Sequence, residues 1–99
     1  MSRFPLHPPD PSRRYPVAVE CLKVVIPGEG YHFEPFRVRW FDDRRWTVER
    51  IYGHEVIARE DGLDITRWRV QLSGQPKYLY QKGGDSWFVL PKCMPERLP

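Results

Sequence analysis

The order of apolar and polar residues along the chain predicts short antiparallel strands. The first is the segment 17–26, VAVECLKVVI, which is rich in β-branched residues and ends at Pro27. Pro27 and the flexible residues 28–30 predict a turn there. A loop through Phe33 to Pro35 is expected to lead into the next strand.

Strict alternation follows in the segment 36–41, FRVRWF. Successive side chains of a strand point to opposite faces of the sheet. One face would therefore carry the apolar residues Phe36, Val38 and Trp40. The opposite face would carry Arg37 and Arg39, and alternation resumes at Trp46.

A three-residue turn, Asp42-Asp43-Arg44, or a slightly longer one would join these two apolar runs. A hairpin centred on Asp43 places Trp40 opposite Trp46. The same register predicts two further cross-strand pairs, Val38 with Val48 and Arg37 with Glu49. The second pair joins opposite charges, which supports this register and partly neutralises the arginine row.

The second half of the chain predicts two more hairpins after an unclear segment. In residues 53–66, Gly53 and Asp61-Gly62 interrupt any period, so we expect a strand continuation and a long excursion there. Alternation returns in 67–72, which directs Trp68, Val70 and Leu72 to one face. Turns at 73–77 and at Gly83-Gly84 then predict the pairs Leu72 with Tyr78, Val70 with Tyr80, Tyr80 with Trp87, and Tyr78 with Val89. An alternative register with Leu79 inward stays open.

Together these elements predict a mainly β protein, a single antiparallel meander of about five strands that curls into a small, partly open barrel. The domain would span residues 17–90. A chain of 99 residues builds only a small core, so the tryptophans Trp40, Trp46, Trp68 and Trp87 are expected to fill it. The proline-rich segments 1–16 and 91–99 are expected to be a flexible arm and a flexible tail.

Several strand motifs resemble those of a known family. They are Pro35-Phe36, Trp40, Trp46-Thr47-Val48, Trp68-Arg69-Val70, Tyr78-Leu79-Tyr80 and Trp87-Phe88-Val89-Leu90. Over roughly residues 17–90 the chain resembles a family of short bacterial β-meander proteins of unknown function. Members occur alone or attached to translesion-type DNA polymerases. The resemblance implies a fold, and it adds support for a role near DNA.

Charge and cysteine content give little further direction. The net charge is +3, and twelve of the sixteen cationic residues are arginines, whose planar groups suit phosphate or carboxylate. Cys21 and Cys93 stand far apart without the close spacing of zinc or redox motifs, so we expect two free thiols. No signal peptide and no apolar run of membrane-spanning length is visible, which predicts a cytoplasmic protein.

The sequence offers no constellation for catalysis, metal binding or a cofactor. His7, His32 and His54 lack companions at metal-ligand spacing. Acidic residues cluster at Asp42-Asp43 and around Asp61, where turns favour aspartate in any case. No activated nucleophile and no phosphate-binding glycine loop is present. We therefore expect a non-enzymatic binding domain without a small-molecule substrate.

The arginine face is the main candidate site. It offers Arg37, Arg39, Arg45, Arg67 and Arg69, with Phe41 beside them. If strands 36–41 and 67–72 are neighbours, these residues form one basic patch that could bind a nucleic-acid backbone weakly. The alternative is an adaptor, in which a sheet edge and the proline-rich arm bind a protein partner by strand addition. A third interpretation is that the arginine face binds nothing and is only the solvent-exposed side of the sheet.

Overall fold

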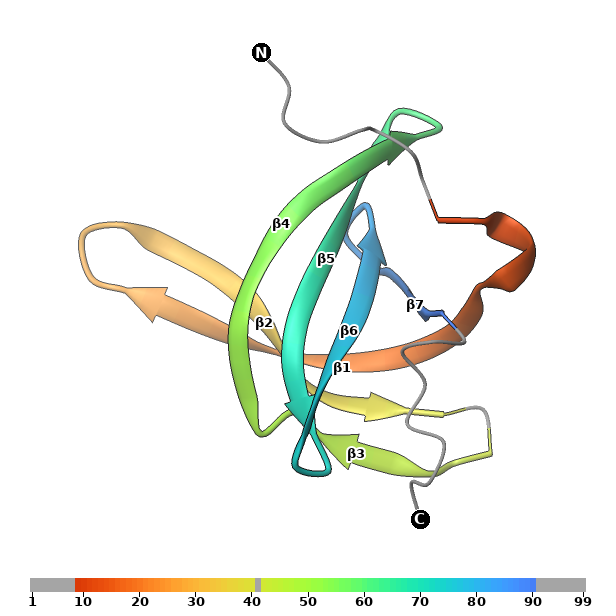
Figure 1. The fold of residues 1–99 in the computed structure, drawn as a ribbon. Coiled ribbons are helices and arrows are strands. Elements are labelled where there is room, and N and C mark those ends of the chain that lie inside the picture. The colour runs from red at the N-terminus through yellow and green to blue at the C-terminus, as the bar shows by residue number, and fades with distance from the viewer. Residues whose placement is uncertain (1–8, 41, 91–99) are drawn as a thin grey trace.

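The computed structural model describes residues 9–40 and 42–90, which form one seven-stranded antiparallel sheet curled into a half-barrel (Figure 1). The elements are η1 (Pro11–Arg13), β1 (Tyr15–Ile26), β2 (Gly30–Arg39), β3 (Arg45–Thr47), β4 (Arg50–Glu60), β5 (Leu63–Leu72), β6 (Gln75–Lys82) and β7 (Ser86–Val89). The mainly β meander is confirmed, but it has seven strands and not about five. Within this described part, no helix is long and apolar enough to span a membrane.

Pairing of the first strand with the last curls the meander. The strand order is β3-β2-β1-β7-β6-β5-β4, with Tyr15 to Val17 of β1 paired to β7 and Ala18 to Ile26 paired to β2. The barrel stays open between β3 and β4, the two ends of the strand order, and two consecutive amides bridge part of this gap. The Val48 N–H donates to the Phe36 carbonyl at 2.8 Å, and the Glu49 N–H donates to the Gln71 carbonyl at 2.9 Å.

The β1–β2 hairpin is longer than the sequence predicts. The segment from Phe33 to Pro35, expected to be a loop, belongs to β2, which begins at Gly30. Its ladder runs from Ala18 opposite Arg39 to Ile26 opposite Gly30, with one irregularity between Glu20 and Cys21. The outer part of this hairpin projects away from the rest of the sheet (Figure 1).

Residues 53–66, expected to hold a long excursion, form most of the β4–β5 hairpin. Asp61 and Gly62 make its two-residue turn with φ angles of 54° and 77°, as a primed turn requires. The ladder is irregular between Ile51 and Gly53 and between Val56 and Ala58. Each extra residue reverses the facing of the side chains that follow, so no single period fits the sequence here.

Three predicted registers are wrong. Trp46 pairs with Val38 instead of Trp40, because the turn residues extend from Trp40 to Arg44. The β5–β6 turn is only Ser73-Gly74, which places Val70 opposite Lys77 and Trp68 opposite Leu79. The β6–β7 turn has three residues, so Tyr80 pairs with Phe88. The inward residue of β6 is therefore Leu79, the alternative that the sequence left open.

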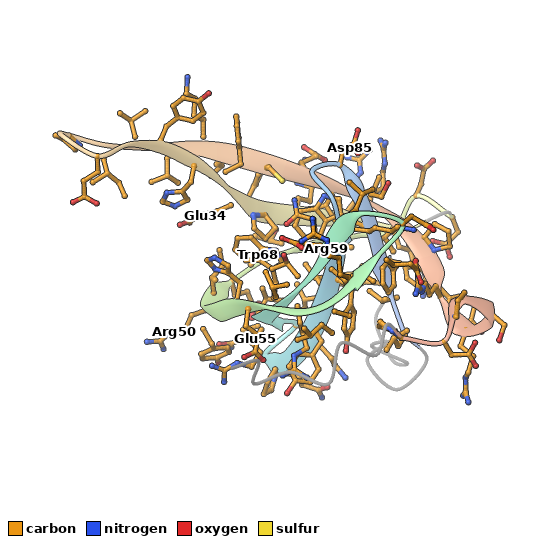
Figure 2. The ribbon with its side chains drawn as sticks, turned by 90° about the horizontal axis from the view of Figure 1, so that it is seen from above. Glu34, Arg50, Glu55, Arg59, Trp68 and Asp85 are labelled. Atoms are coloured by element: carbon orange, nitrogen blue, oxygen red, sulfur yellow. The ribbon has the colours of Figure 1, made fainter. Side chains whose placement is uncertain are left out.

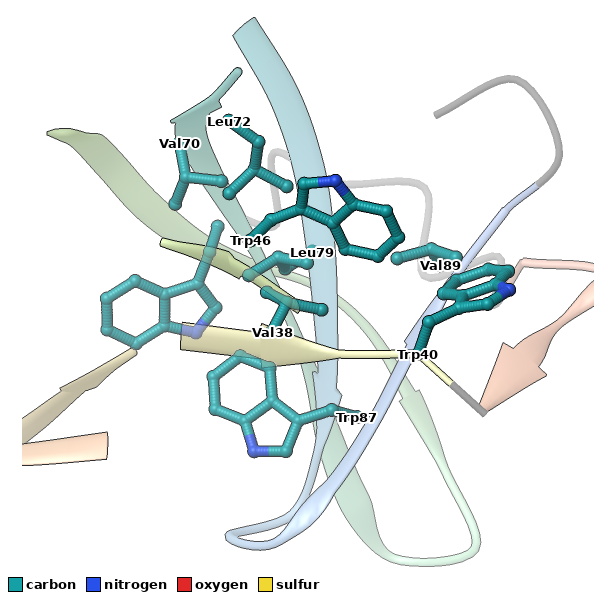
Figure 3. Close-up of a cluster of buried hydrophobic side chains, with 9 residues drawn as sticks. Val38, Trp40, Trp46, Val70, Leu72, Leu79, Trp87 and Val89 are labelled. Atoms are coloured by element: carbon teal, nitrogen blue, oxygen red, sulfur yellow. The ribbon is translucent and has the colours of Figure 1, made fainter. Parts of the chain in front are cut away.

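All four tryptophans are buried, as predicted, in a cluster between the two halves of the curled sheet (Figure 3). Trp40 and Trp46 still meet edge to face at 6.0 Å between ring centroids. The cluster also contains Val38, Val70, Leu72, Leu79 and Val89.

A second, smaller cluster consists of Ala58, Ile65, Tyr80 and Phe88. The Tyr80 and Phe88 rings stack at 5.3 Å, and the Arg14 guanidinium lies 4.7 Å from the Phe88 centroid. Phe88 points to the opposite face of β7 from Trp87 and is nevertheless only 5% exposed.

The folded part begins before the predicted boundary at residue 17. η1 and the first two residues of β1 fall within the segment expected to be a flexible arm. The Arg14 guanidinium donates two hydrogen bonds of 2.8 Å to the Glu60 carboxylate. Residues 1–8 of the predicted arm and the tail 91–99, which includes Cys93, lie outside the described residues, and Cys21 is a free, exposed cysteine.

Candidate binding surface

The predicted arginine patch is divided in two by the strand order. Arg37 and Arg39 lie on β2, whereas Arg67 and Arg69 lie on β5. Along the strand order, β1, β7 and β6 stand between β2 and β5, and across the gap between β3 and β4 the two strands are linked through the amides of Val48 and Glu49. The condition that these two strands are neighbours is not met, so each arginine group is a separate candidate.

The β2–β3 group is partly neutralised. Arg37 forms an ion pair of 3.5 Å with Glu20 on β1, and not with Glu49 as the predicted register required. Arg39 lies directly opposite Arg45, and neither makes an ion pair within the described part of the chain. Phe41, expected beside them, lies outside the described residues. The Arg37 guanidinium also lies 5.2 Å from the ring centroid of Phe36, which is half-buried.

The β5 group is built differently, because a tyrosine of β6 lies between its arginines. Arg69 pairs with Tyr78 in the β5–β6 ladder. The Arg67 guanidinium lies 4.7 Å from the Tyr78 ring centroid and donates a hydrogen bond to Glu55 on β4. The Glu55 carboxylate raises the pKa of Arg67 and, as its ion-pair partner, balances the positive charge of this guanidinium.

Arg69 is the exposed cation of this group. Its Nη2 atom lies 3.5 Å from the position that a Cβ would take on Gly53, so the guanidinium rests over the glycine backbone of β4. Among the ion pairs of the described residues, none involves Arg69. Its charge is therefore available to an external anion.

Two shallow hollows meet at Arg69 and Tyr78. The first, of about 350 Å³, is lined by Gly53, His54, Glu55, Arg67, Arg69 and Tyr78. The second, of about 230 Å³, is lined by Tyr52, Arg69, Pro76, Lys77 and Tyr78. Both therefore combine aromatic and cationic residues.

Sequence reasoning missed Arg50, Tyr52 and Tyr78 as members of this surface. Arg50 points away from the barrel (Figure 2), and its guanidinium lies 5.7 Å from the Tyr52 ring centroid. Tyr52 is 44% exposed, and its hydroxyl donates to the Gln71 side chain at 2.9 Å. The basic-tyrosine face is our name for the surface formed by Arg50, Tyr52, Arg67, Arg69 and Tyr78. For the two residues on β4, Arg50 and Tyr52, the only signal in the sequence was their Arg-x-Tyr spacing just before Gly53.

Among the described residues, the aspartates and histidines considered in the sequence analysis occupy turns or contact neighbouring side chains. Asp43 and Asp61 stand in turns at positive φ, 71° and 54°. His54 stacks on Trp68 at 4.3 Å, and His32 lies 2.7 Å from Glu34. Within residues 9–40 and 42–90, no group of three or more histidine, cysteine or acidic side chains is arranged to hold a metal ion.

No family model, curated protein or solved structure matches this chain. The resemblance to short bacterial β-meander proteins therefore stays a prediction that rests on strand motifs.

Proposed function

We propose that the protein is a non-enzymatic binding domain that holds single-stranded nucleic acid on the basic-tyrosine face. The observation that carries the proposal is the position of Arg69, an exposed cation without an ion-pair partner among the described residues, between two hollows that also contain tyrosine rings. Cations that follow a phosphate backbone, interleaved with aromatic rings, are the usual means of binding single strands.

Each residue of this face has a defined part in the proposal. Arg50 and Arg69 would contact phosphates, and the exposed ring of Tyr52 would stack on a base. Arg67 is held by Glu55 and Tyr78, so it supports the surface more than it contacts a ligand. The predicted site of five arginines is thereby narrowed to its β5 members, Arg67 and Arg69, and extended by Arg50 and Tyr52.

The test is a fluorescence titration with a labelled oligonucleotide at 50 and 200 mM salt. Each phosphate contact on a single strand contributes about 0.7 to the slope of log affinity against log salt. The double variant Arg50→Gln/Arg69→Gln should lower that slope by about 1.4. The matched control is Arg39→Gln/Arg45→Gln, which should leave the slope unchanged. It removes two arginines of β2 and β3 that form no ion pair among the described residues.

Substitution of the tyrosine separates stacking from charge. Tyr52→Ala should weaken binding by about 1 kcal/mol or more while leaving the salt slope unchanged, because stacking releases no counterions. Equal effects of the two arginine double variants would contradict the proposal, since affinity would then follow net charge alone. If the unmodified protein does not bind the oligonucleotide at 50 mM salt, the proposed function is wrong.

A further inference from the structure

The projecting part of the β1–β2 hairpin, residues 21–35, lacks support at both edges. Pairing of β1 with β7 ends at Val17, and pairing of β2 with β3 ends at Arg37. Four large apolar side chains are exposed on it: Leu22 (54%), Val25 (66%), Tyr31 (61%) and Phe33 (54%). A lone two-stranded ribbon is marginally stable in water, and three or more strands are needed for independent stability.

The edge of β1 also differs from the two ends of the sheet. Natural proteins protect edges with bulges, charges, prolines or short strands. β4 has two ladder irregularities and the charged residues Arg50, Glu55 and Arg59, and β3 is only three residues long. Residues 18–26 of β1 contain no proline and only two charges, Glu20 and Lys23. The one irregularity of the β1–β2 ladder, between Glu20 and Cys21, places its extra residue, Phe36, on β2 and not on β1. This edge is thus left open to another strand.

Charge decides between the classes of partner. Residues 21–35 carry one lysine and two glutamates, a net charge of −1, which leaves +4 for the remainder of a chain whose total is +3. A slightly acidic, apolar ribbon is a poor site for nucleic acid or an anionic membrane. It suits a surface of its own kind, because a net charge of only −1 on each hairpin opposes the pairing of two copies very little.

We propose that the partner is a second copy of this chain, bound by antiparallel pairing of the two β1 edges around Leu22. The open edge runs from Ala18, just beyond the β7 pairing, to Ile26, just before the turn. Leu22 is its midpoint, so this register uses the whole edge and stops where β7 begins. The two hairpins together form a four-stranded sheet, which meets the minimum for a stable ribbon.

This register also covers the most exposed apolar side chain of the hairpin. Val25 of the second copy lies opposite Val19 and on the same face of the sheet. Val19, Cys21, Phe33 and Trp87 line a hollow of about 480 Å³ together with residues of the β6–β7 turn. The nine-residue pairing separates the two basic barrels by roughly 30 Å, several Debye lengths at physiological salt. Charge repulsion between the two copies is therefore small.

The test is analytical ultracentrifugation of the unmodified protein and of charged variants. We expect a concentration-dependent dimer, and we expect Leu22→Glu and Leu22→Lys each to remain monomeric, because like charges then face each other across the two-fold axis. An equimolar mixture of these two variants should form the dimer again. The matched control is Leu63→Glu, since Leu63 is 46% exposed on β5, away from the hairpin; this variant should dimerise as the unmodified protein does.

A disulfide experiment tests the register itself. In a Cys21→Ser/Cys93→Ser background, Leu22→Cys should form an intermolecular disulfide under mild oxidation. Val25→Cys should not, because the two copies of residue 25 lie far from each other. A monomer at concentrations up to about 1 mM would overturn the proposal. So would a dimer that persists in both Leu22 variants, or a mixture of the two that stays monomeric. Circular dichroism of each variant shows that the fold is retained.

Discussion

Glu60 at the end of β4 binds two cations at once, and its removal gives a quantitative test of the structure. The Glu60 carboxylate accepts two hydrogen bonds of 2.8 Å from Arg14, which precedes β1. It accepts a third of 2.8 Å from Lys82 at the end of β6. Three segments that are distant in sequence thus meet at one carboxylate, whose side chain is only 18% exposed.

The magnitude follows from the pKa of this carboxyl group. Hydrogen bonds from Arg14, and then those from Lys82, lower the Glu60 pKa from 4.5 to about 2. The full shift would correspond to about 3.5 kcal/mol of unfolding free energy, at roughly 1.4 kcal/mol for each pKa unit. The cluster is partly solvated, so screening reduces this value. We expect Glu60→Gln to lower the free energy of unfolding by about 1–2 kcal/mol at pH 7.

The pH dependence has a fixed sign. Because the folded-state pKa lies below the unfolded one, the stabilisation is fully present above pH 4.5 and is lost as the pH falls towards 2. Urea unfolding, followed by tryptophan fluorescence between pH 7 and pH 3, measures it. The difference between the unmodified protein and Glu60→Gln should decrease by more than half by pH 3.

The control is Glu29→Gln in the β1–β2 turn. Among the ion pairs of the described residues none involves Glu29, so this variant should match the unmodified protein at every pH. A difference for Glu60→Gln that stays constant from pH 7 to pH 3 would refute the reasoning, since the loss would then not depend on ionisation. Equal stability of the two variants at pH 7 would refute it as well.

Two further predictions concern the β5–β6 hairpin. Ser73 has φ = 50° and Gly74 has φ = 75°, so Ser73→Asn should raise the free energy of unfolding by about 0.5 kcal/mol, and Gly74→Ala should lower it by about 1 kcal/mol. Leu79 is fully buried, so Leu79→Ala should lower the free energy of unfolding by about 2–5 kcal/mol. Leu63 is exposed, so Leu63→Ala should lower it by less than about 1 kcal/mol. Urea unfolding checks all four variants. A Leu79→Ala protein as stable as Leu63→Ala would contradict the inward register of β6.

Local pattern determined much of the sheet. Strict alternation identified the inward residues of β5, Trp68, Val70 and Leu72, because the side-chain period of a strand does not depend on its partner. The predicted burial of the four tryptophans was also correct, since so short a chain has little other material for a core. Alternation gave the faces of the arginines too, but not which strands would lie beside them.

Registers and strand neighbours were decided by the tertiary structure. A hairpin register depends on the number of turn residues, and one residue more or fewer exchanges the faces, as the inward Leu79 and the pair of Tyr80 with Phe88 show. The pairing of β1 with β7 joins residues about seventy positions apart, which no local pattern encodes. That pairing places three strands between Arg37 and Arg67, leaves the outer edge of β1 open, and assembles the basic-tyrosine face from β4, β5 and β6. The sequence by itself therefore determined what each strand presents, and long-range pairing determined which strands present it together.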